Sequence, residues 1–220
     1  MFDALVQYGD LLQKAIWETL LMVGITMGVA IIVGGPLGLV LYLTGRGGLM
    51  ERRWFNEVLG YAVNALRSFP FIILLVILIP VTRFLVGTSI GPRAAAVGLS
   101  VAAIPFFARL VEQSLRDVPR GVVDAAISAG ASYAQIVRLV LLPEAMPALV
   151  SSLTITAISF IAYSAVAGAI GAGGIGDLAI RYGYYRFETE VMIWCVIVMF
   201  VLVQLTQWLG SWAARAVDKR

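Results

Sequence analysis

Long apolar stretches alternate with short polar segments along the chain. Five stretches are long enough to cross a bilayer core, which needs about 20 helical residues. They cover residues 19–43, 58–82, 94–112, 146–170 and 190–214. We therefore predict an all-α polytopic membrane protein with five transmembrane helices, built as a single transmembrane domain over residues 1–220. The first stretch is rich in glycine, and small residues let membrane helices approach closely, so we expect it to pack tightly against its neighbours.

The amphipathic stretch at residues 119–147, called the capped segment below, carries the signals of two short helices. Gly130 suits the end of the first helix, because glycine adopts the left-handed C-terminal conformation readily. Ser132 and Gln135 form an S-x-x-Q capping box that starts the second helix. Pro143 is expected to end that helix, since proline interrupts helical hydrogen bonding. Two capped helices between membrane spans indicate a docking surface for another protein rather than a simple connection.

The composition supports the membrane assignment and excludes several kinds of site. Hydrophobic residues make up 60% of the chain and charged residues only 13%, whereas soluble domains contain about 25% charged residues. The net charge of +3 is small, and basic residues are expected at a membrane surface, so no nucleic-acid partner is implied. The chain has no histidine and only one cysteine, Cys195. We therefore expect no disulfide and no metal site, and interpret Cys195 as a packing residue.

The basic residues near the spans predict the orientation in the membrane. With five spans, the basic residues fall into two groups on opposite sides. The larger group has ten members, namely Arg46, Arg52, Arg53, Arg109, Arg116, Arg120, Arg138, Arg215, Lys219 and Arg220. The smaller group has five, namely Lys14, Arg83, Arg93, Arg181 and Arg186. Cytoplasmic loops carry the excess of positive charge, so the N-terminus is predicted outside and the C-terminus and capped segment in the cytoplasm.

The chain offers no obvious energy source of its own. It has no G-x-x-x-x-G-K-[ST] phosphate loop, and its only lysines are Lys14 and Lys219. An ion-coupled carrier would be expected to show acidic groups within its spans. Here Glu18 and Glu112 are interpreted as lying at span ends. A separate ATPase chain is therefore the favoured energy source.

The glycine-rich sequence GAGGIG at residues 171–176 matches G-x-G-x-x-G. A nucleotide site of that type requires a preceding strand and a βαβ unit, and an apolar span precedes it here. We interpret Gly171, Gly173, Gly174 and Gly176 as a flexible turn at the outer mouth of the protein.

The spacing within the capped segment resembles the EAA loop of ABC importer permeases. The family pattern is E-A-A, three residues, G, nine residues, then I-x-L-P. This chain has Asp124-Ala125-Ala126, Gly130 and Val140-Leu141-Leu142-Pro143 at that spacing. Asp124 replaces glutamate and Val140 replaces isoleucine, which keeps charge and shape. The alternative is a capped helix pair at the membrane surface that has no partner.

The resemblance implies a type I ABC importer permease fold with a cytoplasmic coupling loop at residues 113–145. In that family the loop sits in a cleft of the ATPase subunit and transmits its closure to the pore. ATP and Mg would be bound by that partner, and no cofactor is expected in this chain. The residues assigned to ATPase coupling are Asp124, Ala125, Ala126, Gly130, Ala131, Ile136, Leu139, Val140, Leu142, Pro143 and Glu144. Small alanines permit close approach, and Ile136, Leu139 and Val140 are predicted to form an apolar face.

A wider set of sequence blocks resembles the permease of bacterial methionine importers. These blocks are RSFPFIILL at 67–75, IPVTR at 79–83, VGTSIG at 86–91, LLPEA at 141–145, YSA at 163–165 and GAGGIG at 171–176. The resemblance implies a homodimer in the bacterial inner membrane with two ATPase subunits and an extracytoplasmic methionine-binding protein. It implies import of L- and D-methionine. Another amino acid or an osmolyte is the chief alternative substrate.

Two features are candidates for the translocation pathway. Arg67 lies inside an apolar span, where it either meets a substrate carboxylate or anchors the helix to the headgroups. Ser152, Thr156, Ser159 and Tyr163 share one helix face by their spacing. Each hydroxyl could also bond only a local carbonyl, which is common in membrane helices.

Functions outside the ABC class remain as alternatives. A secondary carrier or channel would need no ATPase, and a membrane scaffold would transport nothing. An enzyme is not expected, because the spans contain no convincing set of catalytic groups.

Overall fold

The computed structural model describes residues 2–218, with side chains from Tyr8 onward, and all regular structure in that range is helical. Four helices are long and apolar enough to cross a membrane, and one bent helix pair, taken as a single span, makes the fifth. The predicted all-α architecture with five spans is confirmed. Lys219 and Arg220, which were assigned to the larger basic group, lie outside the described residues.

The first crossing is one long helix with a widened turn inside it. It consists of α1 (Phe2–Val29), the π-helical turn η1 (Ala30–Gly34) and α2 (Gly35–Thr44). The expected tight packing is confirmed, because a methyl group at Gly38 would lie only 2.4 Å from the carbonyl oxygen of Ala108. Glycine is therefore needed where this helix touches the backbone of a neighbour.

The second crossing, expected over residues 58–82, is not one continuous helix. It is divided into α3 (Arg53–Ser68), α4 (Phe71–Ile77) and α5 (Ile79–Val86), and α3 and α4 meet at 99°. Pro70 has no N–H to donate, and its ring forces Phe69 into an extended conformation with ψ 132°. The helix therefore stops and turns at this dipeptide.

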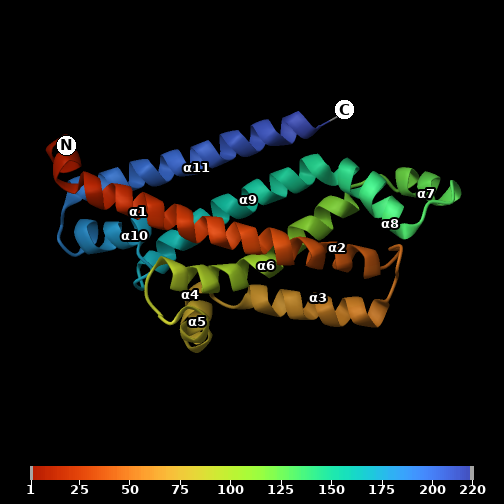
Figure 1. Cartoon of the computed structure of the whole chain (residues 1–220), viewed down its shortest axis with the longest axis horizontal. Helices are drawn as coiled ribbons and strands as arrows, with labels where there is room; N and C mark the ends of the chain where they lie inside the picture. The colour runs from red at the N-terminus through yellow and green to blue at the C-terminus, as the bar shows by residue number, and fades with distance from the viewer. Residues whose placement is uncertain (1, 219–220) are drawn as a thin grey trace.

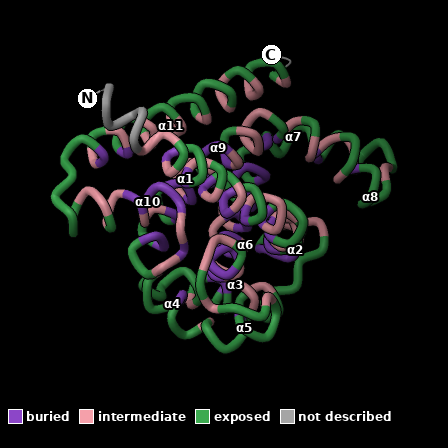
Figure 2. Tube along the Cα trace, turned by 60° about the vertical axis from the view of Figure 1, so that its left-hand side comes forward, coloured by how far each residue is buried: buried purple, intermediate pink, exposed green. Residues whose placement is uncertain are grey.

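The third crossing, α6 (Pro92–Arg116), lies at the centre of the bundle. Its apolar stretch is 61% buried, more than that of any other long helix in residues 2–218. Figure 2 shows the buried colour concentrated on α6, α1 and α10. The small side chains along α6, together with Gly98, let the surrounding helices pack close to its axis.

The remaining helices follow α6 in chain order. They are α7 (Arg120–Ser128), α8 (Tyr133–Gln135), the π-helical turn η2 (Ile136–Leu141), α9 (Leu142–Gly168), α10 (Gly174–Leu178), the π-helical turn η3 (Ala179–Tyr184) and α11 (Thr189–Val217). The fourth crossing runs without interruption over Tyr133–Gly168, and α11 forms the fifth.

The two ends of the elongated molecule carry different elements (Figure 1). One end holds α7, α8 and the connection between α2 and α3, and α11 runs toward it. The other end holds α4, α5, α10 and the N-terminal part of α1. The predicted basic groups separate accordingly: Arg46 and Arg120 belong to the first end, and Arg83 and Arg181 to the second.

Candidate docking site

The first helix of the capped segment ends as its sequence predicts. Gly130 has φ +78°, in the left-handed region that favours glycine. The N–H of Ala131 donates to the carbonyl of Ala126 at 3.1 Å, and the N–H of Gly130 donates to Ile127 at 2.9 Å. This pair of bonds is the Schellman arrangement that closes a helix.

The second helix begins at the predicted capping box, which is confirmed. The N–H of Ser132 donates to Oε1 of Gln135 at 2.8 Å, and Oγ of Ser132 accepts from the N–H of Gln135 at 3.4 Å. Each side chain thus satisfies a backbone group that would otherwise lack a partner at the helix start. The turn between the helices is therefore defined at both ends by its own residues.

Pro143 does not end this helix, so that prediction is wrong. The helix widens into η2 just before the proline, and the N–H of Leu142 donates to the carbonyl of Val137, five residues back. A π turn inserts one extra residue, which removes the clash between the proline ring and the preceding turn. The chain then continues into α9, so the capped segment is rigidly joined to the fourth crossing.

The predicted coupling residues lie on different sides of these helices. Asp124, Ala125, Gly130, Leu139 and Pro143 are exposed, and Ala126, Ala131, Val140, Leu142 and Glu144 are half-buried. Ile136 is fully buried, whereas the side chain of Leu139 is 71% exposed. The apolar face expected from Ile136, Leu139 and Val140 is therefore split, because the three point to different sides of a widened turn. The surface open to a partner consists of α7 and the outer side of η2.

The inner side of the capped segment is part of the main core. Val123 of α7 and Ile136 of η2 are buried in the same cluster as Leu115 of α6 and Leu141. Cores of this kind are close-packed and transmit displacement rather than absorb it. A movement of α7 and η2 is thus coupled to α6 and α9.

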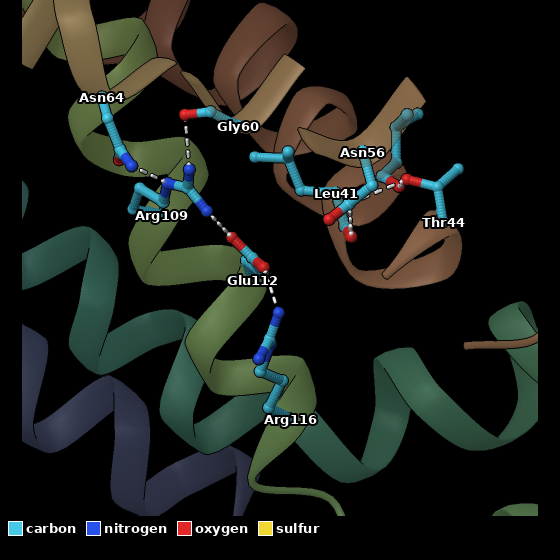
Figure 3. Close-up of polar contacts among 9 residues, drawn as sticks. Leu41, Thr44, Asn56, Gly60, Asn64, Arg109, Glu112 and Arg116 are labelled. Carbon is cyan, nitrogen blue, oxygen red and sulfur yellow. Dashed lines mark hydrogen bonds and ion pairs between the residues drawn. The ribbon is translucent and has the colours of Figure 1, made fainter. Parts of the chain in front are cut away.

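A buried charge network ties α3 to α6 at the same end of the molecule (Figure 3). The side chain of Glu112 is only 5% exposed and bonds both Arg109 and Arg116, each at 2.6 Å. Arg109 also donates to the carbonyl of Gly60 at 2.7 Å and to Oδ1 of Asn64 at 3.1 Å. Both arginines are thereby oriented by one carboxylate.

Sequence reasoning missed this network and placed Glu112 at a span end. The signal that could have found it is the spacing of Arg109, Glu112 and Arg116, which puts all three on one helix face. The partners on α3 are 45 to 49 residues away in the chain, so no local pattern identifies them.

The connection between α2 and α3 is held by polar contacts. Nδ2 of Asn56 donates to the carbonyl of Leu41 at 2.7 Å, as Figure 3 shows. Arg53 and the N–H of Gly47 both bond the carboxylate of Glu51. These donors, Arg53 first, favour the charged form and hold the pKa of Glu51 below its ordinary value.

The candidate pathway residues lie apart from the capped segment. Arg67 is exposed at the end of α3, with its guanidinium carbon 5.9 Å from the ring centre of Phe106. Ser152 and Thr156 are buried against other parts of this chain, where Ser152 shares a hydrogen bond with Ser114 at 2.9 Å. Thr156 donates to the carbonyl of Ser152 at 2.8 Å. Their hydroxyls do not reach an open surface.

Only the outer half of the hydroxyl face remains accessible. Ser159 is half-buried, and the side chain of Tyr163 is 36% exposed and packs against the ring of Phe71 at 4.7 Å. The assignment of Arg67, Ser152, Thr156, Ser159 and Tyr163 to a pathway stays a prediction.

The glycine-rich loop differs from the flexible turn expected from its sequence. Gly171, Gly173 and Gly174 have positive φ, which glycine permits. However, Gly174 and Gly176 are buried and begin the short helix α10. The N–H of Gly174 donates to Glu18 at 2.8 Å. A methyl group at Gly176 would lie 2.1 Å from the carbonyl oxygen of Ala165, so these glycines serve close packing.

Known proteins are similar in sequence to this chain along its whole length. Residues 34–220 match the family described as the binding-protein-dependent transport system inner membrane component. The probable D-methionine transport system permease protein MetI of Vibrio cholerae serotype O1 is 48% identical over 223 residues, covering 100% of this chain and 99% of the relative. The methionine import system permease protein MetP of Bacillus subtilis strain 168 is 43% identical over 222 residues, covering 100% of both chains.

Solved structures share the fold. A chain of the inward-facing MetNI methionine ABC transporter has a TM-score of 0.94 and 44% identity, covering 97% of this chain and 99% of that chain. An amino acid ABC transporter with histidines is 20% identical with a TM-score of 0.80, which shows the shared fold alone. The chain therefore belongs to the family of binding-protein-dependent transport system inner membrane components and is an inner-membrane permease with the type I ABC importer fold.

Proposed function

We propose that this chain is the permease subunit of a methionine importer driven by a separate ATPase. Two relatives that align with the whole of this chain are named for methionine transport. The chain also superimposes on a chain of a methionine ABC transporter with a TM-score of 0.94. The proposal covers methionine of both configurations, since the Vibrio relative is named for D-methionine. The chain performs no bond chemistry, and ATP and Mg are bound by the ATPase.

The observation that carries the proposal is the construction of the capped segment. One side of α7 and η2 is exposed at the end of the molecule, and the other side is packed into the core through Val123 and Ile136. An ATPase that binds the exposed side and changes shape would therefore move α6 and α9. This is the physical requirement for coupling ATP hydrolysis to an alternating-access cycle.

The working assembly is a homodimer with two ATPase subunits and an extracytoplasmic methionine-binding protein. Five crossings in one chain are few to surround a solute path, and a two-fold copy supplies ten and presents two capped segments to two ATPases. The family description, which refers to binding-protein-dependent transport, supports an external delivery protein.

The end that carries the capped segment is proposed to face the cytoplasm, with the N-terminus outside. Arg46, Arg116 and Arg120 gather at that end, in line with the positive-inside rule. This orientation also presents the docking surface to the compartment that contains ATP.

The decisive experiment separates coupling from assembly. Gly130→Pro forces φ near −65° at a position that requires +78°, so it breaks the turn between α7 and α8. In vesicles containing the purified complex, we expect the variant to retain its ATPase subunits and lose most ATP-driven methionine uptake. Gly121→Ala is the matched control, because Gly121 lies on exposed α7 with no atom within 4 Å of an added methyl group.

Undiminished uptake by Gly130→Pro would contradict the coupling role. Uptake in vesicles that lack the ATPase would instead favour a secondary carrier or channel. A binding protein that delivers a ligand other than methionine would overturn the substrate assignment while leaving the coupling role in place.

A further inference from the structure

A cavity of about 110 Å³ lies toward the end of the molecule opposite the capped segment. Its walls come from α4 and α5, from the start of α6, and from the connection between α9 and α10. Within residues 8–218, none of the residues assigned to ATPase coupling lines it. The cavity is therefore separate from the candidate docking site.

Small side chains create the space inside this cavity. Four buried alanines line it, namely Ala94, Ala95, Ala167 and Ala172. Protein interiors are close-packed and contain few voids larger than a water molecule. A space of this size that is kept open by alanines on three elements therefore indicates room for an occupant.

The walls of the cavity are apolar and uncharged. In the part of the chain that the structure describes, no charged side chain lines it. Thr82 and Ser89 contribute two hydroxyl groups to an otherwise apolar wall. Apolar walls with a few polar groups are typical of small-molecule sites.

The cavity adjoins the candidate pathway. It is built partly from the second crossing, which is broken at Pro70, and transporters commonly form substrate sites at discontinuous membrane helices. The ring of Tyr163, a candidate pathway residue, packs against that of Phe71 at the start of α4, with ring centres 4.7 Å apart. Leu75, which lines the cavity, lies one turn further along the same helix.

The size of the cavity limits what it can hold. An apolar cavity of about 150 Å³ in another protein takes benzene, so this one has room for a smaller apolar group. A thioether side chain is unbranched and adapts its rotatable bonds to an irregular space. The two hydroxyl groups favour a thioether, whose sulfur is a weak acceptor, over the hydrocarbon chain of a lipid, which offers no acceptor.

We propose that this cavity receives the thioether side chain of methionine during import. Because its walls carry no charge, the ammonium and carboxylate groups stay outside it, and the cavity recognises the side chain alone. Val76 and Ile79 line the cavity and are 53% and 41% exposed, so they form its open edge. This inference rests on the proposed function, which supplies the substrate.

The first test measures thermal unfolding of the purified full-length chain in detergent with added amino acids. A ligand that binds only the folded state raises the melting temperature. We expect L-methionine to raise it, and norleucine as well, because both have an unbranched side chain. L-alanine is expected to leave it unchanged. Alanine carries the same ammonium and carboxylate groups, so it isolates the contribution of the side chain.

The second test fills the cavity. Ala94→Val narrows it, and we expect methionine to bind at least about tenfold more weakly, since even one methylene in an apolar pocket changes affinity by that factor. ATP-driven methionine uptake by vesicles containing the complete complex should fall as well. Ala102→Val is the matched control, because it makes the same change on α6 outside the cavity. Ala172→Val fills the cavity from another wall and carries the same expectation if Ala94→Val does not fold.

Several results would overturn the inference. An unchanged melting temperature with methionine would do so, and an equal rise with alanine would show recognition of the charged groups alone. An equal response to methionine in Ala94→Val and the unmodified protein would place the binding elsewhere. Stabilisation by octanoate and not by methionine would assign the cavity to a lipid chain.

The two tests also separate this inference from the proposed function. If vesicles with the unmodified complex took up no methionine, the proposed function would fail. If they took up methionine but methionine did not stabilise the chain, only the assignment of the cavity would fail.

Discussion

Glycines in the first long helix have different surroundings. Gly34 and Gly38 lie against the backbone of α6, where an added methyl group would be 2.8 Å from Ile104 and 2.4 Å from Ala108. Gly24 and Gly28 have no atom within 4 Å of an added methyl group. The first pair is therefore fixed by packing, and the second pair has no such constraint within this chain.

Gly38→Ala is expected to destabilise the protein by about 1–3 kcal/mol, because overpacking displaces α6. Gly28→Ala should leave stability unchanged or raise it slightly, since alanine favours the helix. Thermal unfolding in detergent measures both variants. Equal melting temperatures for the two would contradict the packing role of Gly38.

Within the charge network, replacing Glu112 should lower the free energy of unfolding more than replacing any other residue. Glu112→Gln leaves Arg109, whose side chain is 23% exposed, without its counter-charge. Breaking a buried ion pair in this way lowers the free energy of unfolding by about 3–5 kcal/mol. The control Glu57→Gln removes a carboxylate that is 66% exposed and 3.9 Å from Arg46, and such a pair contributes about 0–1 kcal/mol. Similar unfolding midpoints would show that the network contributes little.

At the scale of elements, two widened turns stand directly before prolines within long crossings. Two of the three π turns in residues 2–218 stand directly before a proline-containing helix start: η1 precedes Pro36 and η2 precedes Pro143. The extra residue gives the ring room and leaves the axis continuous. Pro70 has no such turn before it, and there the chain bends by 99°.

The start of α8 depends on its capping box. Ser132→Ala removes the acceptor for the N–H of Gln135, and loss of such a cap costs about 1 kcal/mol. We expect faster amide exchange over residues 133–136 while the core of α9 stays protected. Ser128→Ala is the control, because its hydroxyl only donates to the carbonyl of Asp124. Equal exchange in the two variants would contradict the capping role.

At the scale of the whole molecule, the fold separates two chemically different ends. The end with α7 and α8 holds a cluster of arginines, and the opposite end holds the aromatic segment Tyr184–Phe187. Tyr184 is 62% exposed and Phe187 is 84% exposed. This separation permits a direct test of orientation.

Single cysteines should label from opposite sides of intact cells. We expect Tyr184→Cys to react with an impermeant maleimide from outside, and Ala134→Cys on exposed α8 to react only after the membrane is opened. The native Cys195 is 2% exposed, so the unmodified protein serves as a low-background control. Reversed labelling would place the N-terminus in the cytoplasm.

Much of the element-level organisation could be predicted because its signals are local. The glycine at 130 and the pair Ser132–Gln135 specify a turn through bonds that reach no further than five residues. The spans follow from their length and apolarity alone. The bend at Pro70 was missed because a proline alone does not decide whether a helix breaks. Pro105 and Pro147 lie inside the continuous helices α6 and α9 without a widened turn directly before them.

The surroundings of individual site residues could not be predicted in the same way. Ile136 and Leu139 have similar side chains, three residues apart, yet one is buried and the other exposed. In a regular α-helix two residues three positions apart would lie on the same face, but the π turn has more residues per turn and places these two side chains on different faces. Similarly, Ser152 and Thr156 belong to the polar face that suggested a pathway, but both are buried, and Ser152 bonds Ser114 of α6. Tyr163 on the same face is exposed.

The sequence by itself determined the membrane class, the number of crossings, the two capped helices and the spacing that marks the family. These properties rest on composition and on contacts within a few residues. The tertiary structure alone decided which residues of the capped segment face outward, how Glu112 holds two arginines, and how Gly174 binds Glu18 from 156 residues away. Such contacts join segments that are distant in the chain, so they exist only once the helices have packed.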